Sequence, residues 1–183
     1  MQSEALIQSF IEQTRQHLNR AAQLNELNID DLNWRESQDS WSILECLEHL
    51  NLYGDYYLPE MEKEIGQARK STSPQFSSGM LGGYFAKMML PKEKLNRMKT
   101  FKDKNPIHTS LDRKVIDRFT RQQHQLLELL NRAREVDLSS VKVTTSISKL
   151  IRLKLGDTFA FYINHIIRHL RQADRVQAAM GQP

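Results

Sequence analysis

The feature that most constrains this fold is a helical repeat of apolar residues in four long segments. Apolar side chains recur at steps of three and four residues over 4–27, 43–68, 110–136 and 157–180, the spacing of one face of an α-helix. The 183 residues include only 7 Gly and 5 Pro, so few positions interrupt a long helix. Amphipathic helices bury their apolar stripes against one another. We therefore predict an all-α fold, an antiparallel four-helix bundle in one domain over 1–183.

Local signals mark where these helices begin. Ser42 and Glu45 have the spacing of a capping box at the start of the second helix. Ser3 is the expected N-cap of the first helix, and Asp157 that of the fourth. The third helix is expected to open at Thr109-Ser-Leu-Asp112. The polar residues among these carry a side-chain oxygen that can accept a hydrogen bond from a free backbone N–H group at the start of a helix.

The period of the pattern changes between the third and fourth helices. Over 138–155 most apolar residues occupy odd-numbered positions, and most residues between them are polar: the odd-numbered ones are Val141, Val143, Ile147, Ile151, Leu153 and Leu155. Alternation of this kind is typical of an extended chain. The pattern predicts a short strand pair or an extended connector, although 147–155 also fits a helical turn.

A long insertion is predicted between the second and third helices, over 69–108. It contains nine Lys or Arg residues and two acidic residues, with Gly, Pro and Ser at several points. Long connections in compact domains usually contain structure of their own, so we expect either a short helix within 84–98 or a mobile lid, loosely packed near one end of the bundle. A basic segment can meet nucleic acid, anionic lipid or a carboxylate ligand, but a solvated loop face is the favoured interpretation.

Several classes of protein are disfavoured by composition. Cys46 is the only cysteine, so no intramolecular disulfide can form; we interpret it as a small core residue. No stretch approaches the roughly 18 apolar residues that cross a bilayer, and the first residues lack the pattern of a signal peptide. We expect a cytoplasmic soluble protein with no membrane partner. Nucleic acid is also not an expected partner, because no recognised binding motif is present.

Histidine spacing indicates a metal site. His165 and His169 lie four residues apart in the fourth helix, so their rings project from the same face. The surrounding residues are apolar, and a buried polar side chain needs a partner. His49, at the edge of the stripe of the second helix, is a candidate third ligand. Three neutral imidazoles suit zinc, nickel, iron or copper better than magnesium or calcium, and they leave a coordination position open.

The other three histidines are weaker candidates. His108 and His124 are expected at the surface, and His17 is interpreted as a half-buried core residue. Tyr53, Tyr56 and Tyr162 lie within a turn or two of the histidines in sequence. They could hydrogen-bond a bound water, but core packing is the favoured role. The sequence contains no Gly-rich phosphate loop, nucleophile elbow or zinc-finger cysteine set.

Two of these motifs together resemble the DinB/YfiT-like superfamily. The segment from Trp41-Ser42 to His49-Leu50 is similar to its helix-two motif, and His165-Ile-Ile-Arg-His169-Leu-Arg-Gln172 is similar to its C-terminal His-x-x-x-His motif. The resemblance implies the bundle and one divalent metal held by His49, His165 and His169, with zinc or nickel expected first. Leu-Arg-Gln after His169 departs from the Arg-Gly-Gln of many relatives.

The resemblance leaves three functions open. A metal-dependent enzyme would act on a small-molecule substrate, as a hydrolase or as an S-transferase with a low-molecular-weight thiol as cosubstrate. A non-catalytic module would bind a ligand or partner and hold a structural or vestigial metal. A nucleic-acid binder would use the basic insertion, and is disfavoured. A homodimer is the expected assembly.

Overall fold

The protein is mostly helical in the computed structural model, which describes residues 1–90 and 100–181. The four long helices are α1 (Ser3–Asn25), α3 (Ile43–Gln67), α5 (Lys114–Arg132) and α6 (Leu155–Met180). The shorter elements are α2 (Ile29–Asn33), α4 (Met80–Met89), the 3₁₀ helices η1 (Lys102–Lys104) and η2 (Ala133–Glu135), and the strands β1 (Lys142–Thr144) and β2 (Arg152–Lys154). The prediction of an all-α fold is confirmed.

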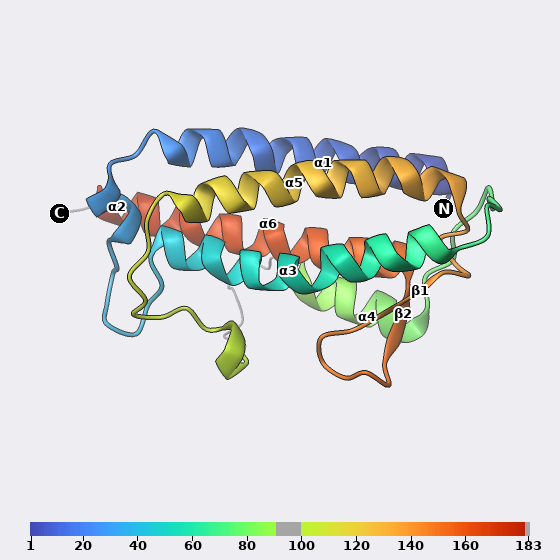
Figure 1. The fold of residues 1–183 in the computed structure, drawn as a ribbon. Helices are drawn as coiled ribbons and strands as arrows, with labels where there is room; N and C mark the ends of the chain where they lie inside the picture. Colours follow the sequence, from blue (N-terminus) through green and yellow to red (C-terminus); the bar gives the residue numbers. More distant parts are fainter. Residues whose placement is uncertain (91–99, 182–183) are drawn as a thin grey trace.

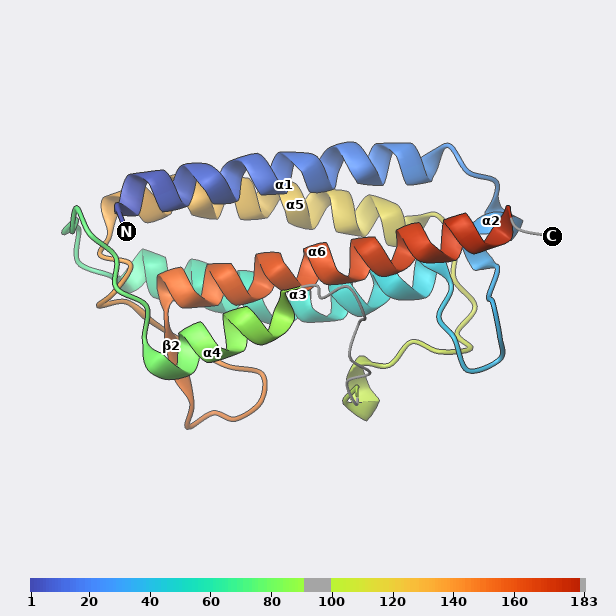
Figure 2. The same ribbon diagram turned by 180° about the vertical axis from the view of Figure 1, so that it is seen from behind.

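The four long helices lie side by side, and each packs against two of the others (Figures 1 and 2). α5 lies between α1 and α3, and α6 contacts the same two helices from the other side. α1 and α5 run in opposite directions. Glu4 at the start of α1 pairs with Arg134 just after the end of α5, and His17 further along α1 bonds Gln123 in the middle of α5. Aliphatic and aromatic side chains of all four helices fill the space between them.

Two neighbouring helix pairs run parallel. Along α3 and α5, Glu48 pairs with Arg118 and Glu62 pairs with Arg132, so both residue numbers rise together. α1 and α6 are also parallel (Figure 2). The prediction of a wholly antiparallel arrangement is therefore wrong for these two pairs. Only a short loop forces consecutive helices to be antiparallel, whereas the long connection over 68–113 returns the chain to the end where α3 began.

The start of α3 is the best-defined helix terminus. The Ser42 hydroxyl accepts from the Glu45 backbone N–H at 3.2 Å, and the Glu45 carboxylate accepts from the Ser42 N–H at 2.7 Å. The predicted capping box is confirmed. Arg35 donates two further bonds to Glu45, and the His108 backbone N–H donates another at 2.6 Å. These bonds occupy the buried carboxylate and fix the first turn of the helix that carries His49.

The predicted caps of the other three helices are wrong. The N-cap of α1 is Gln2, and Ser3 already lies inside the helix. α5 begins at Lys114, whose backbone N–H bonds the Asp112 carboxylate just before the helix. α6 begins at Leu155, so Asp157 lies in the first turn, where it accepts hydrogen bonds from the Ser78 hydroxyl and the Gly79 backbone N–H. Asp157 therefore fastens the start of α4 instead of capping its own helix.

Of the alternatives predicted for 138–155, the structure contains the strand pair. β1 and β2 form a two-stranded antiparallel sheet in which Val143 pairs with Leu153, and both side chains are buried. The hydroxyl of Tyr56 on α3 donates to the carbonyl of Thr145 at 2.9 Å. This hairpin connects α5 to α6 and is held against α3.

The part of the insertion that forms α4 packs closely on α6 (Figure 2). Ala86 and Met89 are buried against it, and the side-chain amide of Asn164 donates to the Ala86 carbonyl at 2.9 Å. The expectation of loose packing is therefore wrong for 80–89. The helix expected within 84–98 begins earlier, at Met80, and residues 91–99 lie outside the described residues.

Candidate metal centre

The structure brings the three predicted ligands together between α3 and α6. His49 projects from α3, and His165 and His169 project from adjacent turns of α6. Nε2 of His49 lies 3.1 Å from Nε2 of His165, and one ligand nitrogen from each ring lies within 4.8 Å of the other two. Antiparallel packing of α3 on α6 places position 49 opposite position 165. These atoms form a nitrogen-only donor set that could hold a metal ion.

Hydrogen bonds to the other ring nitrogen orient two of the histidines. Nδ1 of His49 lies 2.6 Å from the Lys104 carbonyl oxygen, which can only accept, so Nδ1 carries the proton. Nδ1 of His169 lies 2.9 Å from Oε1 of Gln172. Protonation of both Nδ1 atoms leaves an unshared electron pair on each Nε2. Partners of this kind fix the tautomer of metal-ligating histidines in known sites.

The donor spacing fits a transition metal. Zn–N bonds of 2.0–2.1 Å with tetrahedral angles place ligand nitrogens about 3.3 Å apart. The 3.1 Å between the Nε2 atoms of His49 and His165 is close to this value. The ligand nitrogen of His169 lies within 4.8 Å of the other two, so a movement of the ring completes the set. Two electron pairs facing each other at this distance repel unless a cation or a proton lies between them.

All three imidazoles are held neutral. Burial lowers the pKa of His49 to about 4, against the opposing effect of its hydrogen bond to Lys104. Burial also lowers the pKa of His165 and His169 well below the usual value, and the neighbouring histidines and Arg168 act in the same direction. Neutral imidazole is the form that binds metal, so the site needs no proton release near pH 7.

Aromatic rings surround the cluster. The Trp41 ring centroid lies 4.8 Å from that of His49 and 5.6 Å from that of His169. Tyr53 packs against His49 and His165, at 5.0 and 4.5 Å between centroids. Burial raises the pKa of Tyr53 to about 12, so its hydroxyl stays protonated. These rings lower the local polarity and strengthen the attraction between the donor nitrogens and a cation.

The cluster is well shielded from solvent. His49, His165 and His169 are 3%, 4% and 9% exposed. The segment at η1 covers the His49 side: its Lys104 ammonium donates to the Leu52 carbonyl at 3.2 Å. Asn105 accepts from the Trp41 indole N–H at 3.1 Å. A substrate that approaches the rings from this side would need the segment to move.

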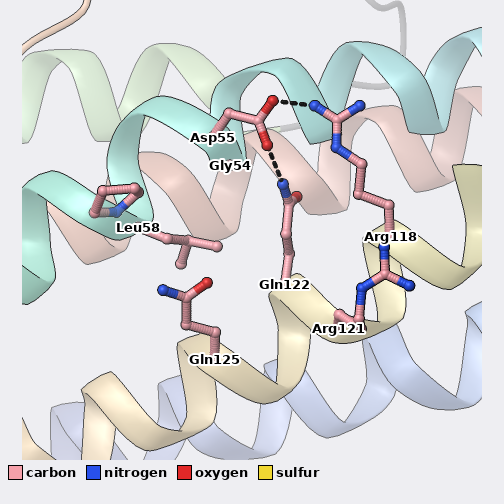
Figure 3. A pocket seen from close by; sticks show the side chains of 8 residues that line it. Gly54, Asp55, Leu58, Arg118, Arg121, Gln122 and Gln125 are labelled. Carbon is pink, nitrogen blue, oxygen red and sulfur yellow. Dashed lines mark hydrogen bonds and ion pairs between the residues drawn. The ribbon is translucent and has the colours of Figure 1, made fainter.

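A groove lies on a different face, between α3 and α5 (Figure 3). Its volume is about 560 Å³ and none of the three histidines lines it. Asp55 accepts from both Arg118 and Gln122 along one wall. The Gln122 side chain packs against Gly54, where a Cβ atom would lie 2.1 Å from Oε1 of Gln122. Asp55, Arg118 and Gln122 are therefore already paired with one another, and we interpret them as contacts that hold α3 against α5.

The remaining sequence candidates are not part of the three-histidine cluster. His108 and His124 are exposed, as predicted. His17 is 3% exposed, more deeply buried than expected, and bonds Gln123 on α5 at 3.2 Å. Cys46 is a buried core residue, and burial raises the pKa of its thiol. The Tyr162 hydroxyl is buried and has no hydrogen-bond partner within the described residues.

Sequence reasoning missed the partners that orient the rings. Gln172 was recognised only as part of the C-terminal motif, although its position three residues after His169 places it within reach on the same helix face. Lys104 contributes through its backbone carbonyl. Every residue has this group, so the sequence does not indicate that position 104 orients His49. The role of Trp41 as a wall of the site was also missed.

The chain belongs to the DinB superfamily: the model of this family matches residues 11–173. The match spans both histidine motifs and confirms the resemblance found in the sequence. Neither the curated proteins nor the solved structures gave a match. Among the described residues, no helix is long and apolar enough to cross a membrane.

Proposed function

We propose that the protein binds one divalent transition-metal ion through His49, His165 and His169. The observation that carries this proposal is the convergence of three neutral imidazoles, two of them with the proton fixed on the nitrogen that faces away. Zinc and nickel are the ions we expect first, because an all-nitrogen site selects against magnesium and calcium. Superfamily membership supports the same set of ligands.

The activity that best accounts for such a site is metal-dependent chemistry on a small molecule. Three protein ligands leave a coordination position for a substrate, a thiol or water, as in catalytic rather than structural zinc sites. A bound ion supplies Lewis acidity, which lowers the pKa of a thiol or water and polarises a substrate. We favour an S-transferase that uses a low-molecular-weight thiol, with a hydrolase as the alternative reaction.

A non-catalytic role is the second candidate, and burial of the site favours it. The rings are at most 9% exposed and lie beneath Trp41, Tyr53 and the segment that contains Lys104. A metal in such surroundings would tie α3 to α6 without meeting a substrate. The protein would then be a ligand- or partner-binding bundle with a structural metal.

Metal content and thiol transfer test the two roles separately. Elemental analysis of the purified protein is expected to find about one zinc or nickel per chain, and much less in His169→Ala. The metal-loaded protein is then incubated with a panel of low-molecular-weight thiols and an electrophile whose thioether product absorbs light. Metal-dependent product formation supports the transferase. A chromogenic ester offered in a parallel reaction tests the hydrolase. Bound metal without turnover of any thiol or of the ester favours the non-catalytic role, and absence of metal refutes both.

We also infer that the ring of long helices is the four-helix bundle of this superfamily, with its insertion between α3 and α5. A homodimer in the cytoplasm remains our proposal for assembly and location. Sedimentation equilibrium of the purified protein tests the assembly: a mass of one chain at all concentrations would contradict it.

A further inference from the structure

The outer face of α4 exposes a stripe of large apolar side chains. Met80, Leu81 and Tyr84 are 95%, 48% and 63% exposed. The opposite face of the same helix is also apolar and packs on α6, where Ala86 and Met89 are buried. Lys87 is the only charged residue in α4. A helix that is apolar all round is normally covered on every side, and here the described residues leave one side uncovered.

The loop between β1 and β2 extends this apolar surface. Leu150 is 94% exposed and Ile147 is 44% exposed at its tip. The hairpin is held beside the start of α4, because the Lys154 ammonium donates to the Ser77 carbonyl at 2.6 Å. Both views show α4 and the hairpin loop projecting from the same side of the molecule, away from α1 and α5 (Figures 1 and 2). We call the exposed residues of these two elements the α4–hairpin surface: Met80, Leu81, Tyr84, Lys87, Ile147, Lys149 and Leu150.

The charge of these two elements has a single sign. Residues 80–90 and 142–154 contain five Lys or Arg and no Asp or Glu. Arg152 pairs with Glu64 at 2.9 Å. Lys87 and Lys149 are exposed, and within the described residues neither forms an ion pair with a carboxylate. Two uncompensated lysines therefore accompany the apolar side chains.

We propose that the α4–hairpin surface docks on the face of an anionic lipid bilayer. Exposed apolar side chains that enter the interface, together with lysines that meet anionic headgroups, are the two contributions that hold peripheral proteins on membranes. A second copy of this chain is a poorer occupant, because it would bring lysines against lysines. The proposal departs from the sequence-based expectation of no membrane partner. It requires no spanning helix and does not depend on the metal site.

Vesicle sedimentation tests the proposal on the full chain. The protein is mixed with vesicles of phosphatidylcholine alone, or of phosphatidylcholine with phosphatidylglycerol, and the bound fraction is measured at low and high salt. Binding is expected only to the anionic vesicles and is expected to weaken as salt rises. Lys87→Gln with Lys149→Gln is expected to reduce the partition coefficient about fivefold per lysine. Met80→Ser with Leu150→Ser is expected to reduce it about tenfold or more.

Matched substitutions elsewhere serve as controls. Ile29 on α2 and Lys114 on α5 are exposed residues away from this surface, so Ile29→Ser and Lys114→Gln are expected to leave binding unchanged. Failure to bind anionic vesicles would overturn the proposal. So would equal binding to both vesicle types, or binding that the Met80 and Leu150 substitutions leave intact. Self-association abolished by those same substitutions, without vesicle binding, would assign the surface to a second copy instead.

Discussion

Each ring of the histidine cluster reaches its position through a different kind of neighbour. His49 is oriented by a backbone carbonyl, and His169 by a side-chain amide on its own helix. For His165, Nδ1 is buried and has no hydrogen-bond partner among the residues described; packing between Tyr53 and Phe161 holds its ring. The orientation of His169 thus depends on one replaceable side chain.

Gln172→Leu is expected to weaken metal binding without removing a ligand. Loss of the bond to Nδ1 frees the ring of His169 to rotate and to change tautomer, and partners of this kind contribute about 10–100-fold to metal affinity. Competition with a chromogenic chelator measures the change in Kd for zinc. Gln177 lies on the same helix but bonds Arg20, so Gln177→Leu should keep the wild-type Kd. Equal affinity for all three proteins would mean that Gln172 has no positioning role.

His17 is expected to make stability dependent on pH. Burial lowers its folded-state pKa to about 4, from 6.5 in the unfolded chain. The unfolded state therefore binds the proton first, so stability is complete above pH 6.5 and falls as the pH drops towards 4. The loss assigned to this residue is on the order of 2–3 kcal/mol.

Urea unfolding with a chelator present, at pH 7 and pH 4, measures that loss. His17→Gln removes the titrating group while keeping a polar side chain opposite Gln123. The wild type should lose more stability between the two pH values than this variant. The other buried histidines titrate in both proteins, so their effect cancels in the comparison. Identical losses would show that folding does not lower the pKa of His17.

At the scale of the elements, apolar periodicity predicted which segments are helical, but it did not predict the directions of these helices relative to one another. The stripes of α3 and α6 located both helices to within a few residues at each end, because a buried helix face imposes a regular spacing. The direction of α5 relative to α3 depends on the path of the connection over 68–113. The positions of Gly, Pro and charged residues in that connection do not determine which end of α3 the chain returns to. The parallel packing of α3 and α5 could therefore not be predicted.

The same distinction applies to the candidate site. His165 and His169 could be paired from spacing alone, since both lie on one helix. Placing His49 beside them required α3 and α6 to be neighbours, which the family resemblance supplied. The Lys104 carbonyl could not be found, because any residue offers the same backbone atom. Asp157 was misassigned for a related reason: its residue type fits a cap, but its partners lie in a distant segment.

Asp157 is expected to control how firmly α4 is attached. Its carboxylate bonds the Ser78 hydroxyl and the Gly79 backbone N–H, and its side chain packs where a Cβ atom on Gly82 would lie. Hydrogen bonds to charged groups contribute about 1.5–3 kcal/mol. Asp157→Ala should therefore release the start of α4 and speed proteolytic cleavage within 70–90, as followed by mass spectrometry.

A carboxylate in a separate loop provides the control for that experiment. Asp137 accepts from the Ser139 backbone N–H before β1, so Asp137→Ala should leave cleavage within 70–90 unchanged. The helical circular dichroism of both variants should stay close to that of the wild type, because the four long helices keep their shared core. Unaltered cleavage in Asp157→Ala would show that packing of α4 on α6 is sufficient.

For the whole molecule, the proposed ion would bridge helices that already share an extensive core. α3 and α6 contribute Leu47, Leu50, Phe159 and Ile166 to the same apolar cluster, all of them fully buried. Folding therefore does not require the metal, unlike the folding of a small zinc finger. An ion that binds only the folded chain nevertheless stabilises it by mass action.

Zinc or nickel is expected to raise the melting temperature of the chelator-treated protein. At a free metal concentration of about one hundred times Kd, binding stabilises the fold by about 2.7 kcal/mol, equivalent to about 5–10 °C for a chain of this size. Differential scanning calorimetry with and without metal measures the shift. His169→Ala should melt as a folded protein with little shift, because two remaining imidazoles bind weakly. Magnesium should have no effect on either protein, since nitrogen ligands suit it poorly. A wild-type melting temperature that zinc, nickel, iron and copper all leave unchanged would refute the metal site.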